Sequence, residues 1–258
     1  MAQDMPVNPA AFPQLDPAPI KEAVLEIRVA PQADWDVPRI ARLIQDEFPE
    51  YTGCEQFKRG KLSFIPEKSA NLHSAEWQAV RFRSNDGKRI VVFDRELFAF
   101  SQLAPYQSWD IFLHQGLRLW HKYLEISSVD MIQRIGVRFI NSFPVRSENM
   151  RLNDYFSAPV PPASCFEGTR LGGFLHQEQY LVTGRPYSVT IIRTAQQVPD
   201  KTGQEELILD VDVATTESVL YDDEQINVHL REMHSLKNLA FFCSLAPALL
   251  VQLKEAKT

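Results

Sequence analysis

Cysteine, excess basic charge and long apolar runs are all scarce in this chain of 258 residues. Its three cysteines, Cys54, Cys165 and Cys243, lie far apart and show no CxxC or His-Cys spacing, which argues against a disulfide framework and a zinc motif. No stretch approaches the ~18 apolar residues of a membrane-spanning helix. The N-terminus also lacks the basic and apolar regions of a secretory signal. We therefore expect a soluble, cytoplasmic protein with no membrane partner.

The charge balance and the missing motifs narrow the function further. The chain has 33 Asp and Glu against 27 Lys and Arg, a formal net charge of −6. A general binder of the phosphate backbone needs clustered Lys and Arg in excess, so nucleic acid is not an expected partner. No GxxxxGK[ST] loop, strand-bound GxGxxG or GxSxG motif is present. We predict no cofactor, no metal ion and no catalytic residue.

The first 20 residues form a proline-rich segment of their own. Its prolines remove backbone donors and fix φ, which predicts an extended, non-helical lead-in. They are Pro6, Pro9, Pro13, Pro17 and Pro19.

Hydrophobic periodicity divides the rest into two similar units, residues 21–128 and 129–258. The first unit opens on a strand at 21–29, where apolar and charged residues alternate. A helix over 37–48, strands within 61–102 and a helix over 108–126 follow, with Asp36 and Ser108 as N-caps.

The second unit repeats this order. It opens on the strand MIQRIGVRFINSF (131–143), continues through strands up to 205–214, and ends in a helix that Asp222 or Asp223 caps and Pro247 kinks or terminates. Strands joined by short turns and then covered by a helix predict an α+β fold of two tandem antiparallel meanders, with the helices on one face. Whether the units share one sheet or form separate lobes stays open.

Four segments carry a resemblance to a known family. They are PAPIKEAVLEIR (17–28), RIGVRFIN (134–141), Asp154-Tyr155-Phe156, and the last helix with His229, His234, Asn238 and Phe242. In these segments, which are distributed over most of the chain, the sequence resembles a sporadically distributed bacterial family of uncharacterised proteins of similar size. The resemblance implies no activity. It suggests an accessory protein of the kind that accompanies mobile or defence loci.

Charged side chains on the opening strands are the main candidate site. They are Glu22, Glu26 and Arg28 on the first strand, and Arg134 and Arg138 beside Asn141 on the second. Arg81, Arg83, Arg193, Asp210 and Asp212 occupy similar strand positions. In a curled sheet, the carboxylates could hold a divalent ion and the arginines could clamp phosphates. A solvated sheet face, or an internal salt-bridge ladder of the arginines with Glu22 and Glu26, predicts the same pattern.

Within the candidate strand, Gly136 lies between the two arginines and indicates the close approach of a backbone, a bulge or a ligand. On the last helix, His234 and Asn238 are one turn apart and are predicted to hold the helix against the sheet. His229 and His234 are five residues apart, which is not the i, i+4 spacing of a zinc helix.

Our first hypothesis is therefore a non-catalytic binding protein that recognises a protein partner through a sheet edge or the charged face, in a toxin-neutralising or defence setting. The alternative is a metal-dependent phosphohydrolase of the triphosphate-tunnel type, with Glu22 and Glu26 on the ion and Arg28, Arg134 and Arg138 on phosphates. A third hypothesis is nucleic-acid binding at a local arginine patch. Self-association into a homo-oligomer stays open.

Overall fold

The computed structural model describes residues 12–32, 34–63, 71–144, 151–157, 173–197 and 205–255. None of the helices in these ranges is long and apolar enough to cross a membrane. The elements are β1 (Ile20–Val29), α1 (Val37–Glu47), β2 (Gly53–Ser63), β3 (Asn71–Arg83), β4 (Arg89–Asp94), β5 (Leu97–Leu103), α2 (Trp109–Ile126), β6 (Met131–Pro144), η2 (Leu152–Asp154), β7 (Leu175–Leu181), β8 (Tyr187–Gln197), β9 (Glu205–Thr215), β10 (Val219–Leu220), α3 (Asp223–Ser244) and α4 (Pro247–Glu255).

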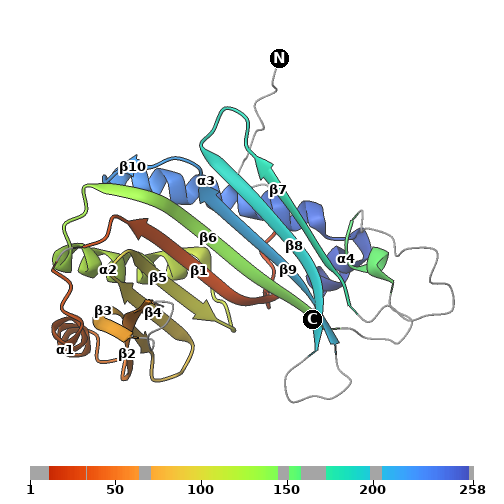
Figure 1. The fold of residues 1–258 in the computed structure, drawn as a ribbon. Coiled ribbons are helices and arrows are strands. Elements are labelled where there is room, and N and C mark those ends of the chain that lie inside the picture. Colours follow the sequence, from red (N-terminus) through yellow and green to blue (C-terminus); the bar gives the residue numbers. More distant parts are fainter. Residues whose placement is uncertain are drawn as a thin grey trace.

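The strands form one large antiparallel sheet. Their order is β2-β3-β4-β5-β1-β6-β9-β8-β7, and the short β10 pairs with β6 (Figure 1). This confirms the predicted α+β fold with antiparallel strands. The central pair is β1 with β6, the opening strands of the two predicted units, so strands from both units lie in the same sheet.

Both halves of the sheet are ordered in the same way. In each half a three-strand meander, β3–β5 or β7–β9, returns its last strand beside the opening strand, and a long helix follows. The first half adds α1 and β2 between its opening strand and its meander. This order is the one that an internal duplication would produce, and the duplication itself stays a hypothesis.

The helices begin where the sequence predicts because side chains satisfy their first backbone donors. Asp36 accepts from the Arg39 amide at 3.0 Å at the start of α1. Ser108 caps α2, and Asp222 caps α3 at 2.8 Å from the Gln225 amide. Helix α3 ends at Ser244, and Pro247 begins a separate helix, α4, so the helix terminates before this proline.

The described helices cover one face of the sheet and leave the other open. The long helices α2 and α3 lie behind the sheet in Figure 1, and the open face is turned to the viewer. Alternate residues of the central strands point at the helices and are fully or almost fully buried: Ala23, Leu25, Ile27, Val29, Ile135, Val137 and Phe139. This confirms the predicted inward faces of both opening strands.

One boundary differs from the prediction. Strand β2 begins at Gly53 and pairs with β3 from that residue on, whereas the sequence indicated strands only from 61. Residues 53–60 lack a clear apolar alternation, and backbone pairing with β3 defines this strand instead. The sequence also predicts a turn near Pro199 and Gly203 and an irregular segment that contains the Pro-rich stretch 158–162; both lie outside the described residues.

Candidate functional site

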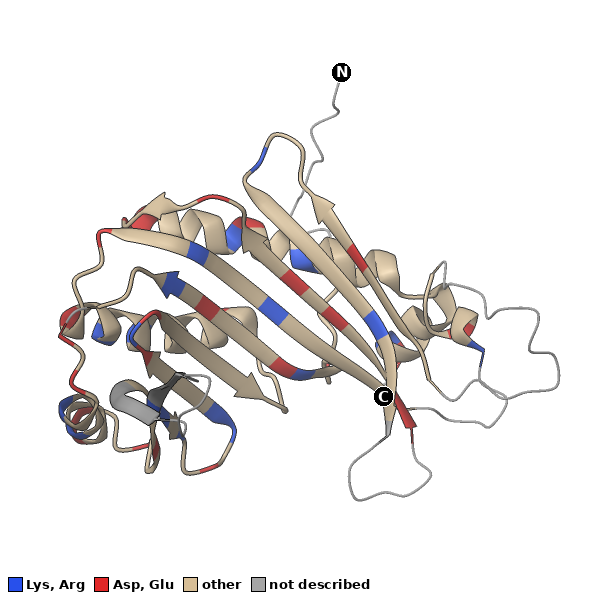
Figure 2. Cartoon of the chain, viewed as in Figure 1, with Lys and Arg blue, Asp and Glu red and all other residues tan. Residues whose placement is uncertain are grey.

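The predicted charged residues meet on the open face of the sheet. Figure 2 shows basic positions on β6 lying between acidic positions on its neighbours β1 and β9. We call this group, which comes from β1, β6 and β9, the sheet cluster: Glu26, Arg28, Arg134, Arg138, Asp210 and Asp212. These residues line an open depression of about 360 Å³.

Ion pairs connect the members of the sheet cluster. Arg134 bridges two strands, with Nη1 at 2.5 Å from Glu26 Oε1 and Nη2 at 2.8 Å from Asp212 Oδ2. Arg138 holds Asp210 through Nε, at 2.9 Å from Oδ1, and through Nη2, at 2.5 Å from Oδ2. Arg28 donates to Glu26 at 2.8 Å. All three arginines therefore have carboxylate partners.

Gly136 makes room for this arrangement. A Cβ atom at Gly136 would lie 2.5 Å from Nη1 of Arg134, which extends along its own strand across the glycine. The group that approaches Gly136 closely is therefore the Arg134 guanidinium, and the pairing of Gly136 with β1 and β9 is regular, without a bulge.

The balance of charge limits what the sheet cluster can bind. Three guanidinium groups face three carboxylates, so the cluster has no excess charge to attract a phosphate or a divalent ion. Hydrogen bonds with Asp210 raise the pKa of Arg138, and burial raises the pKa of Asp212. Within the described ranges, no group of three or more His, Cys, Asp and Glu side chains is placed to hold a metal ion. The arrangement matches the predicted salt-bridge ladder in part. Glu26 pairs with Arg134 as predicted, but the other carboxylates that hold the arginines of β6 are Asp210 and Asp212 on β9. Glu22, the other predicted partner, does not line the depression.

Asn141 lies on the opposite face of the sheet from Arg134 and Arg138. It is 2% exposed, and its amide nitrogen donates to the carbonyl oxygens of Phe139 and Leu209, at 3.2 and 3.0 Å. From Ile135 to Phe143 the odd-numbered residues of β6 are buried on the helix side, so Asn141 belongs to a different site from the two arginines.

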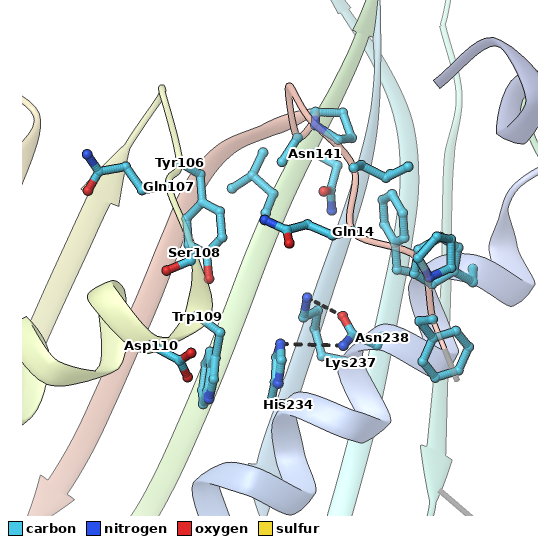
Figure 3. A pocket seen from close by; sticks show the side chains of 18 of the residues that line it. Gln14, Tyr106, Gln107, Ser108, Trp109, Asp110, Asn141, His234, Lys237 and Asn238 are labelled. Atoms are coloured by element: carbon cyan, nitrogen blue, oxygen red, sulfur yellow. Dashed lines mark hydrogen bonds between the residues drawn. The ribbon is translucent and has the colours of Figure 1, made fainter. Parts of the chain in front are cut away.

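That second site is an open pocket of about 500 Å³ on the helix side of the sheet, which we call the helix-side pocket. Four segments build it: residues 12–20, the start of α2 with the preceding loop, the end of β6, and the middle of α3. Figure 3 shows Tyr106 and Lys237 projecting into it from different sides. The described part of the proline-rich segment contains no helix, and Phe12 stacks on Phe242 with ring centroids 5.1 Å apart.

The predicted pair His234 and Asn238 lies in this pocket and holds a lysine. The Lys237 ammonium donates to Asn238 Oδ1 at 2.6 Å, and Asn238 Nδ2 lies 3.4 Å from His234 Nε2. The His234 ring stacks on Trp109, with centroids 4.2 Å apart and an interplanar angle of 3°. The pair therefore joins α3 to the start of α2, and not to the sheet as the sequence suggested.

Burial changes the protonation of these groups. It lowers the pKa of Lys237 to about 7, and, together with the charge of Lys237, it lowers the pKa of His234 to about 3. His234 is therefore neutral near pH 7. A neutral ring accepts at Nε2 from the Asn238 amide, which leaves the Asn238 oxygen facing Lys237.

Sequence reasoning missed Lys237, Trp109 and Tyr106. The signal for Lys237 was present, because it stands four residues after Met233 and four before Phe241, within the apolar stripe of the last helix. No local pattern indicated that residues from four distant segments would meet around it.

Comparison with known proteins adds no identity. A scan against models of protein families finds no match to this chain, and a search of curated proteins finds no similar sequence. The family resemblance carried by the four sequence segments stays a prediction.

Proposed function

We propose that this protein is a cytoplasmic binding protein that recognises a protein partner by pairing an extended segment of it with the outer edge of β7. The observation that carries the proposal is the character of this edge. Strand β7 pairs with β8 on one side, and no strand of the described ranges pairs with its other side. Backbone donors and acceptors along such an edge form a template for one more strand.

The two ends of the sheet differ in the way that this proposal requires. Proteins protect exposed edges with lysines, prolines and bulges. The opposite edge strand, β2, contains Lys58, Arg59 and Lys61, and its pairing with β3 is irregular at two places. Strand β7, with the sequence LHQEQYL, contains no lysine, arginine or proline, and its pairing with β8 is regular.

The side chains of β7 add apolar surface to the edge. Leu175 and Leu181 are 72% and 74% exposed, and Tyr180 is also exposed. Because successive residues of a strand alternate between faces, the two leucines lie on the open face of the sheet and Tyr180 on the other. A partner strand beside β7 would cover apolar side chains on both faces while its backbone completes the ladder.

The test is copurification from the native host with three forms of the tagged protein. The edge variant Leu175→Lys/Leu181→Lys places two charges beside the pairing edge without touching the core. The control Leu220→Lys changes a leucine that is 73% exposed on β10, away from this edge. We expect the same protein partner on the parent and on the control, and its loss from the edge variant.

Hydrogen exchange of the purified complex then locates the contact, because pairing protects the backbone amides of β7. A partner that remains bound to the edge variant, or protection elsewhere with none in β7, would contradict the proposal. If the captured partner is a second copy of this chain, sedimentation of the parent depends on concentration and that of the edge variant does not. The resemblance favours a toxin or another component of a defence locus as the partner.

The phosphohydrolase alternative stays a prediction that no specific observation favours. It requires arginines that are free to bind phosphate, whereas those of the sheet cluster are paired with carboxylates.

A further inference from the structure

We infer that the helix-side pocket binds a small organic carboxylate with an apolar body, and that the Lys237 ammonium supplies its counter-charge. The inference is independent of the proposed function, because the pocket lies on the helix side of the sheet, away from the edge of β7. It rests on the shape of the cavity, on the environment of Lys237 and on the surrounding side chains.

Lys237 is a buried amine that has no anionic partner among the described residues. It is 8% exposed, and its contacts are Asn238 Oδ1 and the ring of Phe139, whose centroid lies 4.2 Å from Nζ. In the described part of the chain no carboxylate pairs with it. A buried ammonium normally has a charged partner, because neutral groups compensate only part of its lost hydration.

Lys122, the other buried lysine in the described ranges, shows the usual arrangement. Lys122 on α2 is also 8% exposed, but its ammonium is paired with Glu47 at 2.6 Å and with Glu125. Burial lowers its pKa, and the hydrogen bonds with the two glutamates outweigh this effect and raise it. In place of two carboxylates, Lys237 faces a cavity large enough for a ligand.

The neighbours of Lys237 hold it in a defined position. Asn238, His234 and Trp109 form a chain of contacts from the ammonium to the start of α2. A cation whose position is set by its neighbours needs little ordering when an anion arrives, which favours binding.

The charge of the pocket suits one negative charge. Its titratable lining groups are Tyr106, Asp110, Arg231, His234 and Lys237. Asp110 and Arg231 are exposed, so water screens them, and His234 is neutral near pH 7. Burial raises the pKa of Tyr106, which therefore stays a neutral hydroxyl. Lys237 is then the one buried charge among these groups, which matches a monoanion better than a phosphate dianion.

The remaining walls suit an apolar body. Phe12, Leu15, Trp109, Phe241 and Phe242 contribute side chains to the lining. Small-molecule pockets of roughly 300–1,000 Å³ commonly combine such apolar walls with a few polar groups.

The experiment is calorimetric titration of the full chain with acetate, benzoate and phenylacetate, and with the neutral benzamide as a control ligand. Lys237→Met removes the charge at nearly constant volume, and Lys122→Met is the matched control on the other long helix. We expect saturable binding of at least one carboxylate to the parent and to Lys122→Met, binding at least tenfold weaker to Lys237→Met, and no preference of Lys237→Met for benzoate over benzamide.

Proton uptake separates a direct contact from a structural role. A carboxylate that binds next to Lys237 raises the pKa of the ammonium, so the parent takes up protons at pH 8 and the apparent enthalpy differs between phosphate and Tris buffers. This difference should vanish in Lys237→Met. Equal affinity of parent and Lys237→Met for the carboxylates, equal binding of benzamide and benzoate to the parent, or no saturable binding of any of the three carboxylates to the folded parent would overturn the inference.

Discussion

Replacing Lys237 with methionine should make the protein more stable at pH 7. The ammonium has a pKa of about 7 in the fold and 10.5 in the unfolded chain. Because each pKa unit corresponds to 1.36 kcal/mol, burying protonated Lys237 costs about 5 kcal/mol. This is comparable with the whole stability of a small domain, about 5–15 kcal/mol. Methionine fills nearly the same space without a charge, so we expect a gain of about 3 kcal/mol after the loss of the Asn238 hydrogen bond.

The sign of the pH dependence is a separate part of this prediction. Between pH 7 and pH 10.5 the unfolded chain binds more protons at this lysine than the fold does, so the free energy of unfolding rises with pH. From pH 7 to pH 9 the rise due to Lys237 is about 2 kcal/mol. Below pH 7 both states are protonated and the full cost applies. Lys237→Met should lack this rise, whereas Lys122→Met, which removes an ion-paired lysine, should keep it.

Urea unfolding at pH 7, 8 and 9 and constant ionic strength, followed by circular dichroism, measures both effects. The difference between parent and variant cancels the titration of all other groups. A Lys237→Met variant that is less stable than the parent at pH 7, or that shows the same rise in stability up to pH 9, would refute the reasoning.

Three further substitutions test the packing and the ion pairs. Gly136→Ala should displace the Arg134 guanidinium, whose Nη1 would lie 2.5 Å from the new Cβ, and so weaken its ion pairs. We expect the free energy of unfolding to fall by about 1 kcal/mol, and an unchanged urea midpoint would contradict this. Gly116→Val should lower the free energy of unfolding by about 1–3 kcal/mol, because even a Cβ at this position would lie 3.0 Å from Leu25 Cδ2 across the interface of α2 with β1. Thermal unfolding measures this loss, and a variant as stable as the parent would contradict the prediction. Asp222→Ala should cost about 1 kcal/mol by removing the N-cap of α3, and Asp222→Asn, which keeps an acceptor, should recover most of it.

Much of the fold could be predicted from local patterns. The alternation in 21–29 and 131–143 identified the buried faces of the two central strands, and the caps Asp36 and Ser108 located the starts of two helices. The same alternation assigns Asn141 to the face opposite Arg138, since three positions separate them along a strand. Grouping Asn141 with the arginines by proximity in sequence therefore missed a signal that the sequence contained.

Local sequence determines which backbone shape a segment prefers and which side chains it turns inward, because both follow from interactions over a few residues. Pairing over long distances in the chain is different. The register of β6 against β9 gives Arg138 its partner Asp210, 72 residues away, and the packing of α3 beside α2 and residues 12–20 encloses Lys237 in a pocket. Those contacts depend on how the hydrophobic faces of all the elements fit together, and the same packing places β7 at the end of the described sheet.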